Sequence, residues 1–180
     1  MMHPMQREKL KMCSFLLQFP DEQMKAELCS VRDQIEAAFD APELDKVGGL
    51  IRHLLHMPLL TLQENFSATF DLHPATCLNL TYHQYGDDKA RGRALARYAQ
   101  AYADAGFVID HQELPDYLPM VLELASEAEA GDSLWMLYDN QSVIAALAER
   151  LVAMDSPYAC ILEITAQMFA LPETEINREA

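Results

Sequence analysis

The sequence has little glycine, few positive charges and no closely spaced cysteines. Only 6 of its 180 residues are glycine, and no Asn-Gly or Asp-Gly turn joins alternating hydrophobic runs, which argues against a β-sheet protein. The four cysteines form no C-x-x-C pair, so neither a zinc ribbon nor a thioredoxin-type site is expected. Lysine and arginine number 13 against 28 acids, a net charge of -15, which argues against a nucleic-acid partner.

Long apolar runs and enzyme fingerprints are missing as well. The first 22 residues hold no uninterrupted apolar stretch of signal-peptide length, and no window approaches a transmembrane helix. We therefore expect a cytoplasmic protein with reduced thiols and no direct membrane insertion. G-x-S-x-G, P-loop and Rossmann motifs are absent, so we predict that the chain is not an enzyme. A helical enzyme or nucleotide hydrolase is the distant alternative, and it predicts turnover by the purified protein.

What the sequence does contain is helical periodicity between spaced prolines and glycines. The hydrophobic share is 51% and the charged share 23%, as in globular proteins. We predict an all-α fold, a single globular helical domain over residues 1–180, with a frayed polar tail at 172–180. The periodicity predicts helices at about 6–18, 22–39, 43–56, 58–70, 75–85, 87–106, 115–129, 131–154 and 157–169.

Local signals mark several of these helix ends. Asp21 is placed to cap the second helix, and Gly106 to end the sixth. Ser156 followed by proline is a typical helix start. The pair Gly48-Gly49 falls inside the third expected helix, where each glycine costs about 1 kcal/mol.

Two groups of histidines are candidate metal ligands. His53 and His56 lie three residues apart on one expected helix, and His73, Cys77 and His83 form a looser group. Neither group has a recognised ligand spacing. We interpret them as structural residues, and we predict no bound metal and no cofactor.

A basic stripe recurs on the sixth expected helix. Lys89, Arg93 and Arg97 follow one another every four residues, which places them on one helix face. The favoured interpretation is a solvated surface. The functional alternative is a contact with an anion or an acidic peptide.

The segment 113–119, ELPDYLP, is more unusual. Two prolines four residues apart flank Asp116 and Tyr117, and Glu113 precedes them. One interpretation is structural, because proline and acids suit the first turn of a helix. The other is functional: an acidic, aromatic-edged rim at a loop–helix junction, suited to a cationic peptide.

Four blocks together resemble a known family. They are LLQFPDE (16–22), FDLHPATCLNLTYHQYGDDKARGRAL (70–95), ELPDYLPMVLE (113–123) and, more weakly, the helix at 145–154 with the residues after it. In these blocks the chain resembles the nitrate reductase molybdenum cofactor assembly chaperones, the delta-subunit branch of the redox enzyme maturation proteins. It departs from the family at Tyr82, where Glu is frequent, at Cys77, where Ser is frequent, and at Tyr117, where related factors have His. The last departure argues against a titrating role at that position.

The resemblance implies a function and partners. The implied function is a chaperone that binds the apo catalytic (alpha) subunit of a respiratory nitrate reductase, including its N-terminal signal-like segment, before cofactor insertion and membrane attachment. The cofactor-insertion machinery is a further candidate partner. The alternative clients are dimethyl sulfoxide, trimethylamine oxide or formate enzymes. An amphipathic client helix would enter a groove between helices. The candidate peptide-binding residues are Glu113, Asp116, Tyr117, Glu123, His83, Tyr82 and Arg91.

Overall fold

The computed structural model describes residues 2–109, 113–127 and 133–170, and within these ranges the chain is helical and has no strand. The predicted all-α class is thus confirmed. The expected tail at 172–180 and the helix start at Gly131 lie outside the described residues. No helix in the described ranges is long and apolar enough to cross a membrane. The helices are α1 (Pro4–Leu16), α2 (Glu22–Ser30), α3 (Arg32–Ala38), α4 (Ala41–His56), α5 (Leu59–Phe66), the π-helix η1 (Ser67–Asp71), the 3₁₀-helix η2 (Pro74–Thr76), α6 (Leu80–Tyr85), α7 (Arg91–Asp104), α8 (Leu118–Glu127), α9 (Trp135–Tyr138), α10 (Gln141–Ala153) and α11 (Ala159–Met168).

Several helix ends follow their local signals. The Asp21 side chain accepts a hydrogen bond from the Met24 amide at 2.6 Å and caps α2, as predicted. Gly106 follows α7 with a φ of 80°, a conformation that glycine adopts without strain. The helix α4 runs through its glycine pair without a break. The single helix expected at 22–39 was wrong: the backbone leaves helical geometry at Val31, which turns both α2 and α3 toward the core.

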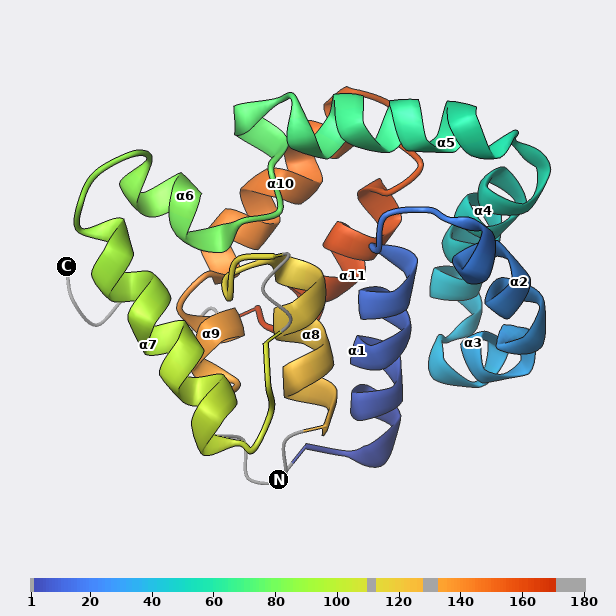
Figure 1. The fold of residues 1–180 in the computed structure, drawn as a ribbon. Coiled ribbons are helices and arrows are strands. Elements are labelled where there is room, and N and C mark those ends of the chain that lie inside the picture. The colour runs from blue at the N-terminus through green and yellow to red at the C-terminus, as the bar shows by residue number, and fades with distance from the viewer. Residues whose placement is uncertain (1, 110–112, 128–132, 171–180) are drawn as a thin grey trace, which may run out of the picture.

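The helices α1 and α8 lie antiparallel at the centre of the molecule (Figure 1). The Ser14 hydroxyl donates to the Pro119 carbonyl at 2.7 Å, and the Arg7 guanidinium donates to the Ser126 carbonyl at 3.2 Å. To one side lie α2, α3 and α4, and to the other α6 and α7, while α10 packs against α11. The α1–α8 pair is therefore the scaffold on which both ends of the molecule are built.

One contiguous set of apolar side chains fills the space between these helices. Burial of such side chains stabilises the fold by roughly 1.5–3 kcal/mol each. The largest fully buried members are Tyr158, Phe66, Leu10, Leu16, Leu17, Leu28, Ile35, Leu50, Leu54, Leu62, Leu78 and Leu80.

Two expected helix starts are corrected by tertiary contacts. The helix expected over 75–85 is wrong in its first half, because residues 77–79 are not helical and the helix α6 begins at Leu80. The helix expected from Pro115 begins instead at Leu118. In both places the backbone forms hydrogen bonds with a distant segment rather than within a first helical turn. The start expected at Asp87 also moves, to Arg91, because the Asp88 side chain accepts the Ala90 amide in a turn.

Candidate functional site

Two segments of the resembling blocks lie side by side in antiparallel orientation. The Leu118 amide donates to the Leu78 carbonyl at 2.8 Å, and the Leu80 amide donates to the Asp116 carbonyl at 3.1 Å. Asn79 and Tyr117 face each other as an isolated β-bridge. This pairing brings the second and third blocks together, although they are far apart along the chain.

The side chain of Asp116 holds this junction from within. Its carboxylate has no exposure to solvent. One oxygen accepts from the Thr81 amide at 2.9 Å and from the Thr81 hydroxyl at 2.5 Å, and the other accepts from Asn79 at 3.1 Å. The Arg91 guanidinium lies 3.5 Å from the carboxylate and supplies the opposite charge. A buried carboxylate needs such partners, so Asp116 serves the junction and is not accessible to a peptide in this structure.

Beside the junction lies a pocket of about 320 Å³, near the lower size limit of ligand pockets. We call it the acidic aromatic pocket. It has two carboxylates and several aromatic rings but, among the described residues that line it, no lysine or arginine. Those lining residues are Phe19, Phe66, Phe70, Asp71, Cys77, Leu78, Asn79, Glu113 and Tyr117.

The aromatic wall of this pocket is a set of rings in edge-to-face and tilted contact. The Phe66 ring lies 5.5 Å from Phe19 and 4.8 Å from Phe70, centroid to centroid. The π-helix η1 follows Phe66 and ends at Asp71. A π-helix is rare in proteins, and those that occur are frequently found at functional sites. Here η1 places an aromatic ring and a carboxylate together in the pocket lining.

The surroundings of Glu113 disfavour the charge of its carboxylate. Burial raises the pKa of Glu113, and the nearby negative charge of Asp71 raises it further. Burial also raises the pKa of Tyr117, so its hydroxyl stays neutral and can donate a hydrogen bond. The Cys77 thiol has its pKa raised by burial as well, which makes it a poor nucleophile. The pocket therefore favours a positively charged group between Asp71 and Glu113.

The seven predicted site residues lie in the pocket lining, at the junction beneath it, or outside both. Glu113 and Tyr117 line the pocket, while Asp116 and Arg91 lie beneath it in the junction. The Arg91 guanidinium lies 5.4 Å from the centroid of the Tyr82 ring.

The remaining two predicted residues lie outside the lining. The His83 ring donates from Nε2 to the Cys77 carbonyl at 2.8 Å and so supports the segment that lines the pocket. Burial lowers the pKa of His83. Glu123 is exposed farther along α8, and the structure does not bring it to the pocket.

Sequence reasoning missed most of the pocket wall. Phe19 and Asp71 were part of the resembling blocks but were not predicted to face Glu113. The only available signal was that three blocks, distant in sequence, all contain an aromatic residue beside an acid or a proline. Among the described residues no group of three or more His, Cys, Asp or Glu side chains could hold a metal ion.

Comparison with solved structures places the fold. A structure described as a redox enzyme maturation protein from Archaeoglobus fulgidus is similar to this chain with a TM-score of 0.64 and 22% sequence identity, over 93% of this chain and 94% of that one. The likeness defines the class by its fold: this chain shares the all-helical fold of that structure.

Sequence comparison narrows the class to a family. The chain is 29% identical over 162 residues to the nitrate reductase molybdenum cofactor assembly chaperone NarJ of Escherichia coli (strain K12), covering 89% of this chain and 69% of that protein. It is 32% identical over 151 residues to the probable NarJ chaperone of Bacillus subtilis (strain 168), covering 84% and 82%. The family model described as nitrate reductase delta subunit matches residues 23–162. The chain belongs to the nitrate reductase delta subunit family.

Proposed function

We propose that this chain is a chaperone for the assembly of a respiratory nitrate reductase. It binds the N-terminal segment of the apo catalytic subunit in the cytoplasm and keeps the subunit ready for molybdenum cofactor insertion before membrane attachment. The similar NarJ proteins are named as molybdenum cofactor assembly chaperones, which supports this client over that of a sister branch. The proposed role is binding without turnover.

One observation supports the peptide site most strongly. Three sequence blocks converge on a single pocket that has two carboxylates and aromatic rings in its lining. A signal-like peptide is expected to be basic, and an arginine or lysine side chain suits this lining. Its cationic head would lie between Asp71 and Glu113, and its stem and head would contact the rings of Phe19 and Tyr117. The volume admits one long side chain rather than a cofactor.

The test is calorimetric titration with a peptide from the N-terminus of the nitrate reductase catalytic subunit. Glu113→Gln and Asp71→Asn should each weaken binding about three- to tenfold, since each removes one charge partner of the peptide. Tyr117→Ala should weaken it at least as much, because tyrosine is a frequent interface anchor.

The control is Glu36→Gln, which removes an equal charge from the exposed face of α3 and should change affinity less than twofold. Equal effects of Glu113→Gln and Glu36→Gln would show that the pocket does not bind the peptide. Tighter binding of a peptide from a dimethyl sulfoxide, trimethylamine oxide or formate enzyme would contradict the proposed client.

A further inference from the structure

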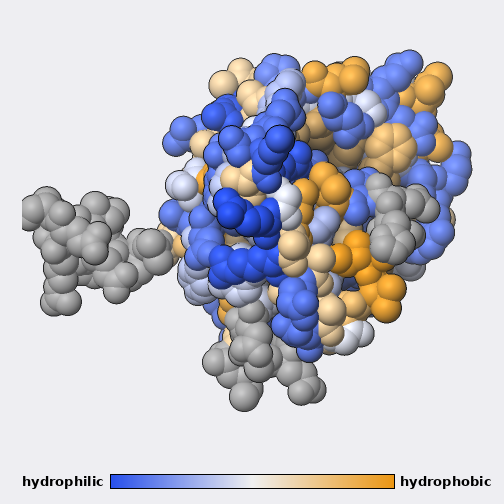
Figure 2. All heavy atoms as spheres, turned by 60° about the vertical axis from the view of Figure 1, so that its left-hand side comes forward, coloured by the Kyte–Doolittle hydropathy of each residue, from blue (hydrophilic) through white to orange (hydrophobic). Residues whose placement is uncertain are grey.

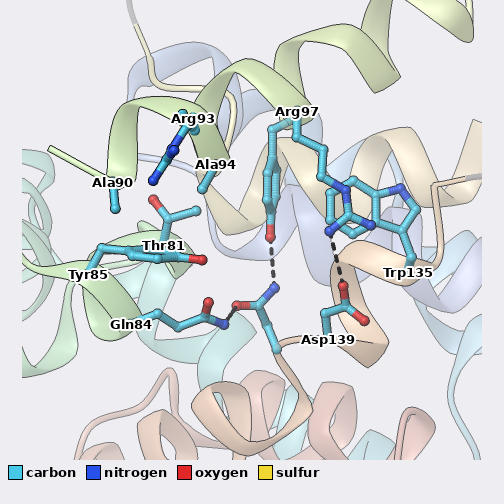
Figure 3. A pocket seen from close by; sticks show the side chains of 11 residues that line it. Thr81, Gln84, Tyr85, Ala90, Arg93, Ala94, Arg97, Trp135 and Asp139 are labelled. Carbon is cyan, nitrogen blue, oxygen red and sulfur yellow. Dashed lines mark hydrogen bonds and ion pairs between the residues drawn. The ribbon is translucent and has the colours of Figure 1, made fainter. Parts of the chain in front are cut away.

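A second pocket, of about 280 Å³, lies between α6, α7 and α9 and shares no lining residue with the acidic aromatic pocket. We call it the α7 pocket. Figure 3 shows Arg93 and Arg97 reaching toward it from α7, with Gln84 and Tyr85 of α6 on the facing side and Trp135 and Asp139 at its edge. Its chemistry differs from that of the first pocket, because two arginines and a single carboxylate, Asp139, line it.

The surrounding segment concentrates positive charge in an otherwise acidic chain. Residues 89–97, KARGRALAR, contain four of the 13 lysines and arginines and no acid. Arg91 is already engaged with the buried Asp116. Arg93 and Arg97 lie four residues apart on α7, about 6 Å along one side of the helix at 1.5 Å per residue. Lys89 does not share the predicted helix face, because it lies in the turn before α7. Figure 2 brings this side of the molecule forward and shows a largely hydrophilic surface with apolar side chains between the polar ones.

The two arginines of the α7 pocket differ in how they are held. The Arg97 guanidinium lies over the Trp135 ring, 3.5 Å from the ring centroid. It also pairs with Asp139 at 3.5 Å, but both side chains of that pair are more than half exposed, so the pair is weak and exchangeable. Arg93 has no ion-pair partner anywhere in the described part of the chain. One cation is therefore free, and another can change partner at little cost.

The floor of the α7 pocket is already ordered. Asn140 is buried, donates to the Tyr98 hydroxyl at 2.7 Å and accepts from Gln84 at 2.9 Å. The Tyr98 ring packs edge-on against Trp135 at 5.1 Å. A preorganised floor lowers the entropy lost on binding.

We propose that the α7 pocket, together with Lys89, is a docking surface for an acidic segment of a partner protein. An acidic side chain of that segment pairs with Arg93, and an apolar neighbour packs on the aromatic edge of the pocket. A protein segment fits better than a small anion, because two arginines one helical turn apart line the pocket and because an aromatic wall accompanies them. This surface is independent of the peptide site proposed above.

The test uses Trp135, which is the only tryptophan of the chain and forms part of the α7 pocket. The probe is a capped peptide of four glutamates and two leucines, compared with the same peptide in which glutamine replaces glutamate. At low salt the acidic peptide should change the tryptophan fluorescence in a saturable way, and the glutamine peptide should not. An absent or unsaturable response would overturn the proposal.

Variants at Arg93 and at Arg32 show whether the acidic peptide binds at the α7 pocket. Arg93→Gln should weaken the acidic peptide about fivefold or more, whereas Arg93→Lys should restore most of the affinity. Arg32→Gln removes the same charge from α3, where the side chain is 74% exposed, and should change affinity less than twofold. Equal weakening by Arg93→Gln and Arg32→Gln would mean general charge attraction and would overturn the proposal.

Inorganic phosphate at matched ionic strength separates the two sources of negative charge. If phosphate saturates the fluorescence change at lower concentration than the acidic peptide, the site is one for small anions and the protein partner is wrong. If the peptide binds more tightly and displaces phosphate, the docking surface is supported.

Discussion

At the scale of single residues, Asp116 shows how a motif residue can act through the fold. Its position between two prolines made it a candidate for the peptide rim. Its carboxylate is instead fully buried, with hydrogen bonds to Thr81 and Asn79 and an ion pair with Arg91. Glu113 and Tyr117, which belong to the same segment, line the pocket instead. Asp116 is thus a positioning residue for the junction.

Asp116→Asn should destabilise the protein by about 2–3 kcal/mol, because it leaves Arg91 without its charge partner in a partly buried place. Urea unfolding measures the loss. The control is Asp139→Asn, whose ion pair is exposed and should contribute less than about 0.5 kcal/mol. Similar small losses for both variants would show that the buried pair does not hold the junction.

Neutralising Glu113 should not destabilise the protein, in contrast to neutralising Asp116. Its pKa is raised by burial and by the charge of Asp71. A group with a raised folded-state pKa stabilises the fold below its unfolded pKa, and that contribution is lost as the pH rises through the folded pKa. Glu113→Gln should therefore equal or exceed the parent in stability above that pKa. The gain should be at most a few tenths of a kcal/mol, because the side chain is largely exposed.

Thermal unfolding from acid to neutral pH tests this expectation. The advantage of Glu113→Gln over the parent should grow as the pH rises. A variant that unfolds at a lower temperature than the parent at neutral pH would show that the carboxylate makes a stabilising contact.

At the scale of elements, α4 tolerates two glycines in its interior. A Cβ added at Gly48 would meet nothing closer than the end of the flexible Arg52 side chain, at 3.6 Å. The glycines therefore cost helix stability without being required by close packing. The helix starts nevertheless with a capping box formed by Asp40 and Glu43, which offsets part of that cost.

Gly48→Ala should stabilise the protein by about 0.5–1 kcal/mol, because alanine loses less backbone entropy on folding. The melting temperature measures it. Gly106→Ala is the matched contrast: with a φ of 80°, a side chain there should cost about 1 kcal/mol. A destabilised Gly48→Ala variant would show that α4 needs the open space beside Gly48.

At the scale of the whole molecule, charge is the dominant feature. The net charge is -15. The acidic aromatic pocket has two carboxylates in its lining, whereas the α7 pocket has two arginines and one carboxylate. A basic client peptide is attracted by the total charge and by the two pocket acids, whereas the basic stripe on α7 repels it. The charge distribution therefore favours one orientation of a charged partner.

The affinity for the basic client peptide should fall as salt rises but should not vanish. Exposed charges are screened over about 10 Å at 0.1 M salt, while the aromatic wall of the acidic aromatic pocket contributes apolar burial that salt does not remove. Calorimetry at low and high ionic strength measures the change. If the affinity for the client peptide does not change with salt, the acidic residues contribute to solubility and not to peptide binding.

The features that the sequence determined by itself are local ones. The all-α class, the cap at Asp21 and the stop at Gly106 followed from periodicity and from single residues, because each depends on neighbours within one helical turn. The four blocks also sufficed to indicate the family. The single-domain boundary of 1–180 stays a prediction.

Only the tertiary structure decided what faces the acidic aromatic pocket. Helical periodicity predicted a helix through residues 77–79, but their backbone bonds to residues near Tyr117 instead. Phe19 and Glu113 meet in one lining although 94 positions separate them, and Asp116 is buried while Tyr117 beside it lines the pocket. Contacts of this kind depend on how the α1–α8 scaffold packs against the rest of the molecule. No pattern within a few residues encodes that packing.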